Sequence, residues 1–123
     1  LMEEGSSGHG SIKRDGITYT GEESVIQKTL DSYVNENNLN VGLIKVDIEG
    51  AEQDFLDGAI ETIIQYRPIL IISIYHSLDD FFNIKPKLEA LNLGYTFKIY
   101  RPILKRSIIS ETLLIAEIID DNN

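Results

Sequence analysis

Apolar residues form several runs of strand length through the middle of the chain. Segments with a helical pattern lie between the first three of these runs. Val41 to Ile48 is β-branched and apolar, and Gly50 marks its end. Ala51 to Gln65 repeats apolar residues at the 3.6-residue period of an amphipathic helix, which Arg67-Pro68 ends because the residue before proline disfavours helical backbone. Pro68 to Tyr75 is apolar on both faces, which is typical of a strand covered by helices on two sides.

The pattern continues with a second helix and two more strands. We predict a helix from Leu78 or Asp79 to Leu91, with Asp79 as its cap and Pro86 as an interruption or restart. Tyr95 to Arg101 and Glu111 to Ile119 are typical of strands. Because no helical pattern separates these two strands, we expect them to form an antiparallel pair.

The beginning of the chain has a different character. Residues 1–23 are a Gly/Ser-rich segment that includes the start of a small β element. Residues 24–123 carry the strand and helix patterns described above. The β element comprises short strands at Ile17 to Tyr19 and Ser24 to Leu30, followed by a helix or turn from Leu30 to Asn37. The predicted fold class is α/β with the order β-α-β-α-β-β, in which a right-handed crossover makes the first two main strands parallel neighbours.

The composition of the chain argues against several classes of function. A net charge of -9 and a pI near 4.6 argue against a nucleic-acid or anionic-membrane surface, since both need clustered Lys and Arg. The absence of cysteine excludes disulfides and thiolate metal sites. No apolar run reaches the roughly 18 to 20 residues of a membrane helix, and no signal-peptide pattern is present, so we expect a cytoplasmic protein without a membrane span.

Candidate chemistry concentrates where two predicted strands end. Asp47 and Glu49 follow the first buried strand, and two carboxylates there can bind a divalent cation, act as a base or hold a sugar hydroxyl. His76 follows the next strand, and parallel pairing puts it at the same edge, where it can act as a base or bind a metal. Glu52 and Asp54, by contrast, are explained by the stabilisation of a helix N-terminus by acidic side chains.

Four stretches of the sequence resemble the FkbM family of S-adenosylmethionine-dependent methyltransferases. The similarity covers roughly Val25 to Ile119 and rests on Thr29-Leu30-Asp31-Ser32-Tyr33, Gly42-Leu43-Ile44-Lys45-Val46-Asp47-Ile48-Glu49-Gly50-Ala51-Glu52, Phe55-Leu56-Asp57-Gly58-Ala59, and Arg67-Pro68 with an apolar strand ending in His76. The resemblance implies the C-terminal half of a Rossmann-like methyltransferase sheet, its fourth to seventh strands, with a final antiparallel strand beside the parallel ones.

The resemblance also implies a reaction and roles for the candidate residues. It implies O-methylation of a saccharide or metabolite hydroxyl with S-adenosylmethionine as cofactor, Asp47 and His76 as catalytic residues, and Glu49 and Gly50 as acceptor-binding residues. The family's glycine-rich loop and its ribose-binding acid belong to a preceding half that this sequence lacks. We therefore expect the C-terminal portion of a longer enzyme, inactive by itself, with its cofactor-binding residues unknown.

Two other interpretations stay open. The half-sheet can serve as a non-catalytic assembly module, or Asp47, Glu49 and His76 can form the oxygen- and nitrogen-rich site of a metal-dependent enzyme; the methyltransferase interpretation assigns no metal ligand. Without a preceding strand, the strand from Leu43 to Ile48 exposes an unpaired edge. We therefore expect a homo-oligomer that pairs through this edge.

Overall fold

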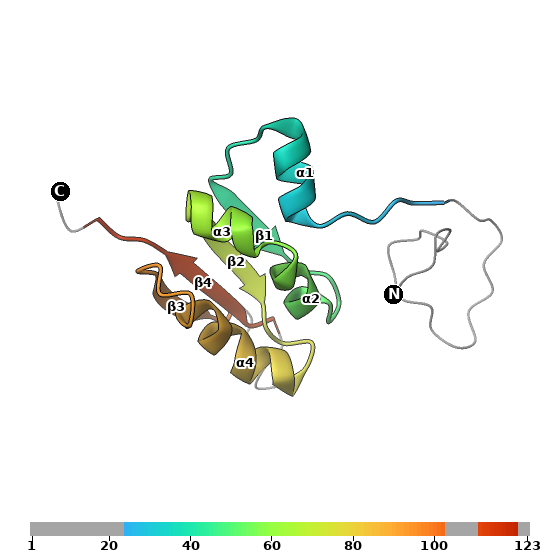
Figure 1. Ribbon diagram of the computed structural model, residues 1–123. Coiled ribbons are helices and arrows are strands. Elements are labelled where there is room, and N and C mark those ends of the chain that lie inside the picture. The colour runs from blue at the N-terminus through green and yellow to red at the C-terminus, as the bar shows by residue number, and fades with distance from the viewer. Residues whose placement is uncertain (1–23, 103–110, 121–123) are drawn as a thin grey trace.

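The computed structural model describes residues 24–102 and 111–120, which form a four-stranded sheet with helices packed on one of its faces (Figure 1). The elements, in chain order, are α1 (Leu30–Asn37), β1 (Leu43–Val46), α2 (Glu52–Asp57), α3 (Ile60–Tyr66), β2 (Ile69–Ser73), α4 (Leu78–Glu89), β3 (Thr96–Tyr100) and β4 (Leu113–Glu117). The predicted strand at Ile17 to Tyr19 and the Gly/Ser-rich segment lie outside the described residues.

The sheet has the order β1-β2-β4-β3. β1 and β2 are parallel neighbours, with Ile44 opposite Leu70, which confirms the predicted crossover. β4 runs antiparallel to β2 on one side and to β3 on the other, which confirms the predicted antiparallel pair. The last strand thus enters the sheet between β2 and β3, and this mixed α/β arrangement is consistent with a methyltransferase-like fold.

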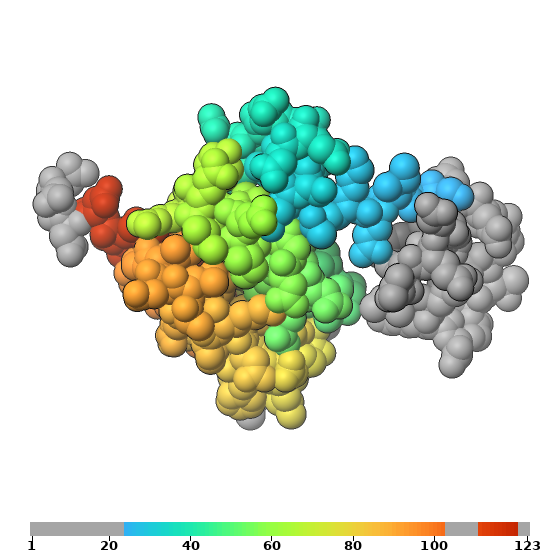
Figure 2. Space-filling view, viewed as in Figure 1, coloured from blue at the N-terminus to red at the C-terminus, as the bar shows by residue number. Residues whose placement is uncertain are grey.

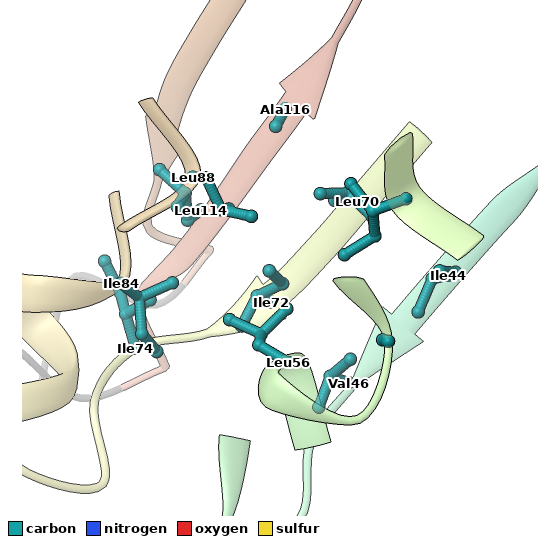
Figure 3. Packing of buried hydrophobic residues seen from close by; sticks show 12 residues of the cluster. Ile44, Val46, Leu56, Leu70, Ile72, Ile74, Ile84, Leu88, Leu114 and Ala116 are labelled. Atoms are coloured by element: carbon teal, nitrogen blue, oxygen red, sulfur yellow. The ribbon is translucent and has the colours of Figure 1, made fainter. Parts of the chain in front are cut away.

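One face of the sheet carries the hydrophobic core. Its strand residues meet helix residues on the facing surfaces of α2, α3 and α4, as the close-up shows (Figure 3), and the core comprises Ile44, Val46, Leu56, Ala59, Ile63, Leu70, Ile72, Ile74, Ile84, Leu88, Leu114 and Ala116. In the space-filling view the helices form a continuous surface over the sheet (Figure 2). The large apolar side chains that point to the opposite face are more exposed, with Leu43 at 56% and Ile69 at 40%.

The single helix predicted from Ala51 to Gln65 is wrong, because the chain forms two helices that break at Gly58. A Cβ atom at Gly58 would lie 3.0 Å from Cβ and Cγ2 of Thr29, a tight contact, so glycine lets the segment that carries Thr29 approach closely. The Gly58 carbonyl also accepts a hydrogen bond of 2.9 Å from the Asp31 N–H. The break is therefore set by a tertiary contact rather than by the local apolar period.

The predicted strand from Ser24 to Leu30 is also wrong. Only Ser24 forms an isolated bridge, and Thr29 caps α1 by accepting a hydrogen bond of 3.1 Å from the Ser32 N–H. A Thr at this position satisfies one of the free N–H groups at a helix start, which favours the helix over a strand. The predicted helix or turn after Leu30 is a helix, α1.

Two details of α4 differ from the prediction, although the helix itself is present. α4 runs through Pro86 without a restart and ends three residues later at Glu89, so the proline lies in the last turn. Ser77, rather than Asp79, caps this helix and accepts a hydrogen bond of 3.0 Å from the Asp80 N–H. Within the described ranges, every helix is too short and too polar to cross a membrane.

Candidate functional site

The candidate residues meet at the carboxyl edge shared by β1 and β2. Because these strands are parallel, the turn after β1 and the residues after β2 come out side by side. Nε2 of His76 lies 3.5 Å from Oδ1 of Asp47 and 3.8 Å from Oε2 of Glu49. The structure thus brings together the three side chains that the sequence placed at this edge.

The turn after β1 presents the two carboxylates. β1 ends at Val46, so Asp47 and Glu49 lie beyond the strand, and their convergence comes from the turn rather than from strand alternation. Glu49 has φ of 59° and Gly50 has φ of 102°, both in the left-handed region that favours glycine. This tight reversal leads directly into α2 and leaves Gly50 beside His76, whose Cβ atom would be 3.9 Å from a Cβ at that glycine.

Glu52 has a role in the cluster that the sequence pattern alone does not predict. Its side chain is fully buried, and Oε1 accepts a hydrogen bond of 3.0 Å from the Ile48 N–H and lies 2.8 Å from Nδ1 of His76. A surface acid at a helix N-terminus does not account for this burial. The available signal was periodicity, since Glu52 precedes Phe55 and Leu56 by three and four residues and so shares their side of the helix.

His76 is the centre of the cluster. Its side chain is 10% exposed, and its ring packs against that of Tyr75 with centroids 4.2 Å apart. Nδ1 faces the buried Glu52, and Nε2 faces the more exposed Asp47 and Glu49, so the imidazole joins the protein interior to the solvent side of the edge. Such an imidazole can relay a proton, orient a carboxylate or bind a cation.

Negative charge also acts on the neighbouring phenol. Burial first, and then the charges of Asp47 and other nearby carboxylates, raise the pKa of Tyr75 above its ordinary value. The Tyr75 hydroxyl therefore stays protonated at neutral pH and remains a hydrogen-bond donor. A separate shallow hollow, lined by residues that include Ile26, Tyr33 and Phe55, shares no residue with the cluster.

Comparison with known proteins gives one assignment. No curated protein and no solved structure gives a significant match to the chain. The model of the family described as "Methyltransferase FkbM domain" matches residues 2–107, which include β1, β2 and the whole carboxylate and histidine cluster. The chain belongs to the FkbM methyltransferase domain family.

Proposed function

We propose that this chain forms the acceptor side of an enzyme that transfers a methyl group from S-adenosylmethionine to a hydroxyl of a saccharide or other metabolite. The observation that carries the proposal is Asp47 at the carboxyl edge of β1, 3.5 Å from His76 of the adjacent strand end, in a member of a methyltransferase family. Ligands of open α/β sheets bind at this edge.

The exposure of each side chain suggests its role. Asp47 is about half exposed, so an acceptor hydroxyl can reach its carboxylate and pass its proton to it. His76 lies behind Asp47 and limits the positions that this carboxylate can take. Glu49 is mostly exposed and can accept hydrogen bonds from neighbouring hydroxyls, while the absence of a side chain at Gly50 leaves backbone accessible to the acceptor.

S-adenosylmethionine, when bound, supplies an electrophilic methyl carbon, to which the acceptor oxygen bonds while the carbon–sulfur bond breaks and sulfur keeps the electron pair. Among residues 24–102 and 111–120, no glycine-rich turn joins a strand to a helix in the pattern that holds such cofactors. The described residues therefore do not fit a cofactor cradle, and we assign them to the acceptor alone.

Methyl transfer from labelled S-adenosylmethionine to a panel of saccharides and hydroxylated metabolites tests the proposal. The assay uses this chain alone and, as the longer protein, a chain that joins it to a preceding cofactor-binding half of the kind that the resemblance implies. Because a positioned base contributes about 10² to 10⁴ to a rate, Asp47→Asn should lower transfer by that factor in the longer protein. Asp54→Asn, an exposed acid of α2, is the matched control and should not alter the rate.

Two results would overturn the assignment. Transfer at the wild-type rate in Asp47→Asn refutes the role of this carboxylate. Absence of both transfer and S-adenosylmethionine binding in the longer protein, measured by calorimetric titration, favours the non-catalytic assembly module instead.

A further inference from the structure

We propose that Asp47, Glu49 and Nε2 of His76 bind a divalent transition-metal cation, and that the buried Glu52 orients His76 for this purpose. One ligand atom from each of the three residues lies within 4.8 Å of the other two. The metal site rests on this geometry, whereas its use in catalysis rests on the proposed function.

The environment of His76 is the first argument. The side chain is nine-tenths buried, and although Nδ1 lies 2.8 Å from Oε1 of Glu52, Nε2 makes no hydrogen bond with any residue in the described ranges. Nε2 points at two carboxylate oxygens from 3.5 and 3.8 Å, which is longer than a hydrogen bond of about 2.7 to 3.2 Å. A buried polar atom aimed at two acids without bonding to either indicates space for something between them.

The separations suit a shared cation. Zinc lies about 2.0 to 2.2 Å from histidine nitrogen and carboxylate oxygen, so two such ligands at a tetrahedral angle stand about 3.4 Å apart. The 3.5 Å between Nε2 and Asp47 is close to this value, and the 3.8 Å to Glu49 needs only a small movement of an exposed side chain. Three protein ligands leave a fourth position open, as in catalytic zinc sites.

Glu52 supplies the second argument. Its Oε1 lies 2.8 Å from Nδ1 of His76 and is held by the Ile48 N–H at 3.0 Å, which favours a proton on Nδ1. The other ring nitrogen then presents a lone pair toward Asp47 and Glu49. A lone pair facing two negative charges is repelled unless a cation lies between them, and a carboxylate behind a metal-binding histidine is the usual partner that fixes its tautomer.

The types of ligand atom restrict which metal ions can bind at this site. Calcium and magnesium prefer oxygen alone, whereas one imidazole with two carboxylates suits zinc or manganese. Within the proposed function, the cation would lower the pKa of an acceptor hydroxyl at the open position and stabilise the negative charge left on its oxygen, so that the proton could pass to solvent as well as to Asp47.

The test is a titration of the full chain, freed of metal by a chelator, with Zn²⁺ and with Mn²⁺, followed by calorimetry and by the electron paramagnetic resonance signal of free Mn²⁺. We expect one site per chain, with Ca²⁺ binding at least tenfold more weakly. Asp47→Asn and Glu49→Gln should each weaken binding at least tenfold. Asp54→Asn should bind as the wild type does, because its carboxylate is exposed and outside the cluster.

Glu52 needs a readout that loss of fold alone would not produce. Glu52→Gln should weaken binding about 10- to 100-fold, as changes to such outer partners do. The ¹⁵N chemical shifts of His76 should show the proton on Nδ1 in the metal-free wild type and a mixture of tautomers in Glu52→Gln. Circular dichroism establishes that each variant used is folded. If Glu52→Gln does not fold, the variants at the exposed Asp47 and Glu49 still test the metal site.

Absence of binding, or equal binding in Asp47→Asn and Glu49→Gln, overturns the metal site. A doubly protonated His76 that excludes the cation at neutral pH overturns it too, because a proton would then balance the carboxylates. The outcome is separate from that of the proposed function. Methyl transfer that persists with chelator overturns the use of the metal in catalysis and keeps the enzyme, whereas specific metal binding without transfer keeps the metal site and overturns the proposed enzyme.

Discussion

The two faces of the sheet are built from similar residues but have different surroundings. On the helix-covered face, Leu70 and Ile72 of β2 are fully buried, whereas on the opposite face Ile69 of the same strand is 40% exposed and Ile71 is half-buried. Leu113 and Ile115 of β4 extend this second apolar surface, and both are only partly buried. Apolarity along a strand therefore indicates what the strand can bury, and the helices present decide what it does bury.

The difference has a physical consequence for the second face. Parallel strands that are apolar on both sides normally lie between two layers of helices. Here α2, α3 and α4 supply one layer over the core (Figure 1). Substitutions on each face therefore measure how much stability that face contributes and how the less covered face and its edge are used.

The largest effect should come from the covered face. Leu70→Ala removes side-chain volume from a fully buried position and should lower the free energy of unfolding by about 2 to 5 kcal/mol. Ile71→Ala, its neighbour on the opposite face, should cost about 1 kcal/mol because its side chain is already partly exposed. Urea unfolding of both variants measures the difference, and equal losses would show that the second face is as well packed as the first.

The second largest effect should come from the hydrogen bonds that join α1 to the start of α3. The Asp31 carboxylate accepts three hydrogen bonds at the start of α3, from the Glu61 N–H at 3.1 Å, the Thr62 N–H at 2.8 Å and the Thr62 hydroxyl at 2.6 Å. Because bonds to a charged acceptor are worth about 1.5 to 3 kcal/mol, Asp31→Ala should destabilise the chain by about that much. Asp31→Asn keeps one acceptor oxygen, so its loss of stability should lie between that of Asp31→Ala and zero. Unchanged urea midpoints would show that these hydrogen bonds do not stabilise the chain.

A third experiment addresses the edge beside the less covered face. We propose that the chain self-associates through β1, which pairs only with β2 among the described strands and carries the exposed Leu43. Leu43→Lys should weaken association at least tenfold, or about 1.4 kcal/mol. Ile99→Lys is matched to it, since Ile99 is 55% exposed on β3, the other edge of the described sheet, and should leave association unchanged. A monodisperse monomer of the wild type in light scattering at micromolar concentration would refute the proposal.

The smallest effect comes from a polar bond at the rim of the covered face. The Tyr95 hydroxyl donates to the Pro68 carbonyl at 2.6 Å, and Tyr95→Phe should cost about 1 kcal/mol. Burial, opposed by the charge of Arg67, raises the pKa of Tyr95 from 10.0 to about 12. The unfolded chain therefore releases this proton first, so stability from this group is complete below pH 10 and is lost between pH 10 and about 12. Urea midpoints across this range should fall less in Tyr95→Phe, and parallel curves would contradict the assignment.

Local patterns account for much of the fold. The apolar runs around Ile44, Leu70 and Leu114 identify three of the strands, and the crossover rule makes the first two of these strands parallel. The same rule places Asp47 and His76 at one edge, where the structure finds them. These inferences succeed because alternation, turn residues and crossover handedness depend on neighbouring residues and on chain chirality.

Two of the errors have the opposite origin, in contacts between residues far apart in the chain. The break at Gly58 arises from its approach to Thr29, which is 29 residues earlier, and the burial of Glu52 arises from a histidine on another strand end. An acid near a helix start has a sufficient local explanation, so its partner across the sheet is not visible in the sequence. The entry of β4 between β2 and β3 is likewise a choice among pairings that the strand pattern leaves equal.

The sequence by itself determined most of the strands and helices, which family the chain resembles, and which edge of the sheet carries Asp47 and His76. The tertiary structure alone decided that Glu52 lies behind His76, that Glu49 turns back toward the same ring, and that the described helices pack on one face of the sheet. Those outcomes depend on contacts between residues far apart in the chain, and their energies exist only once the strands have paired.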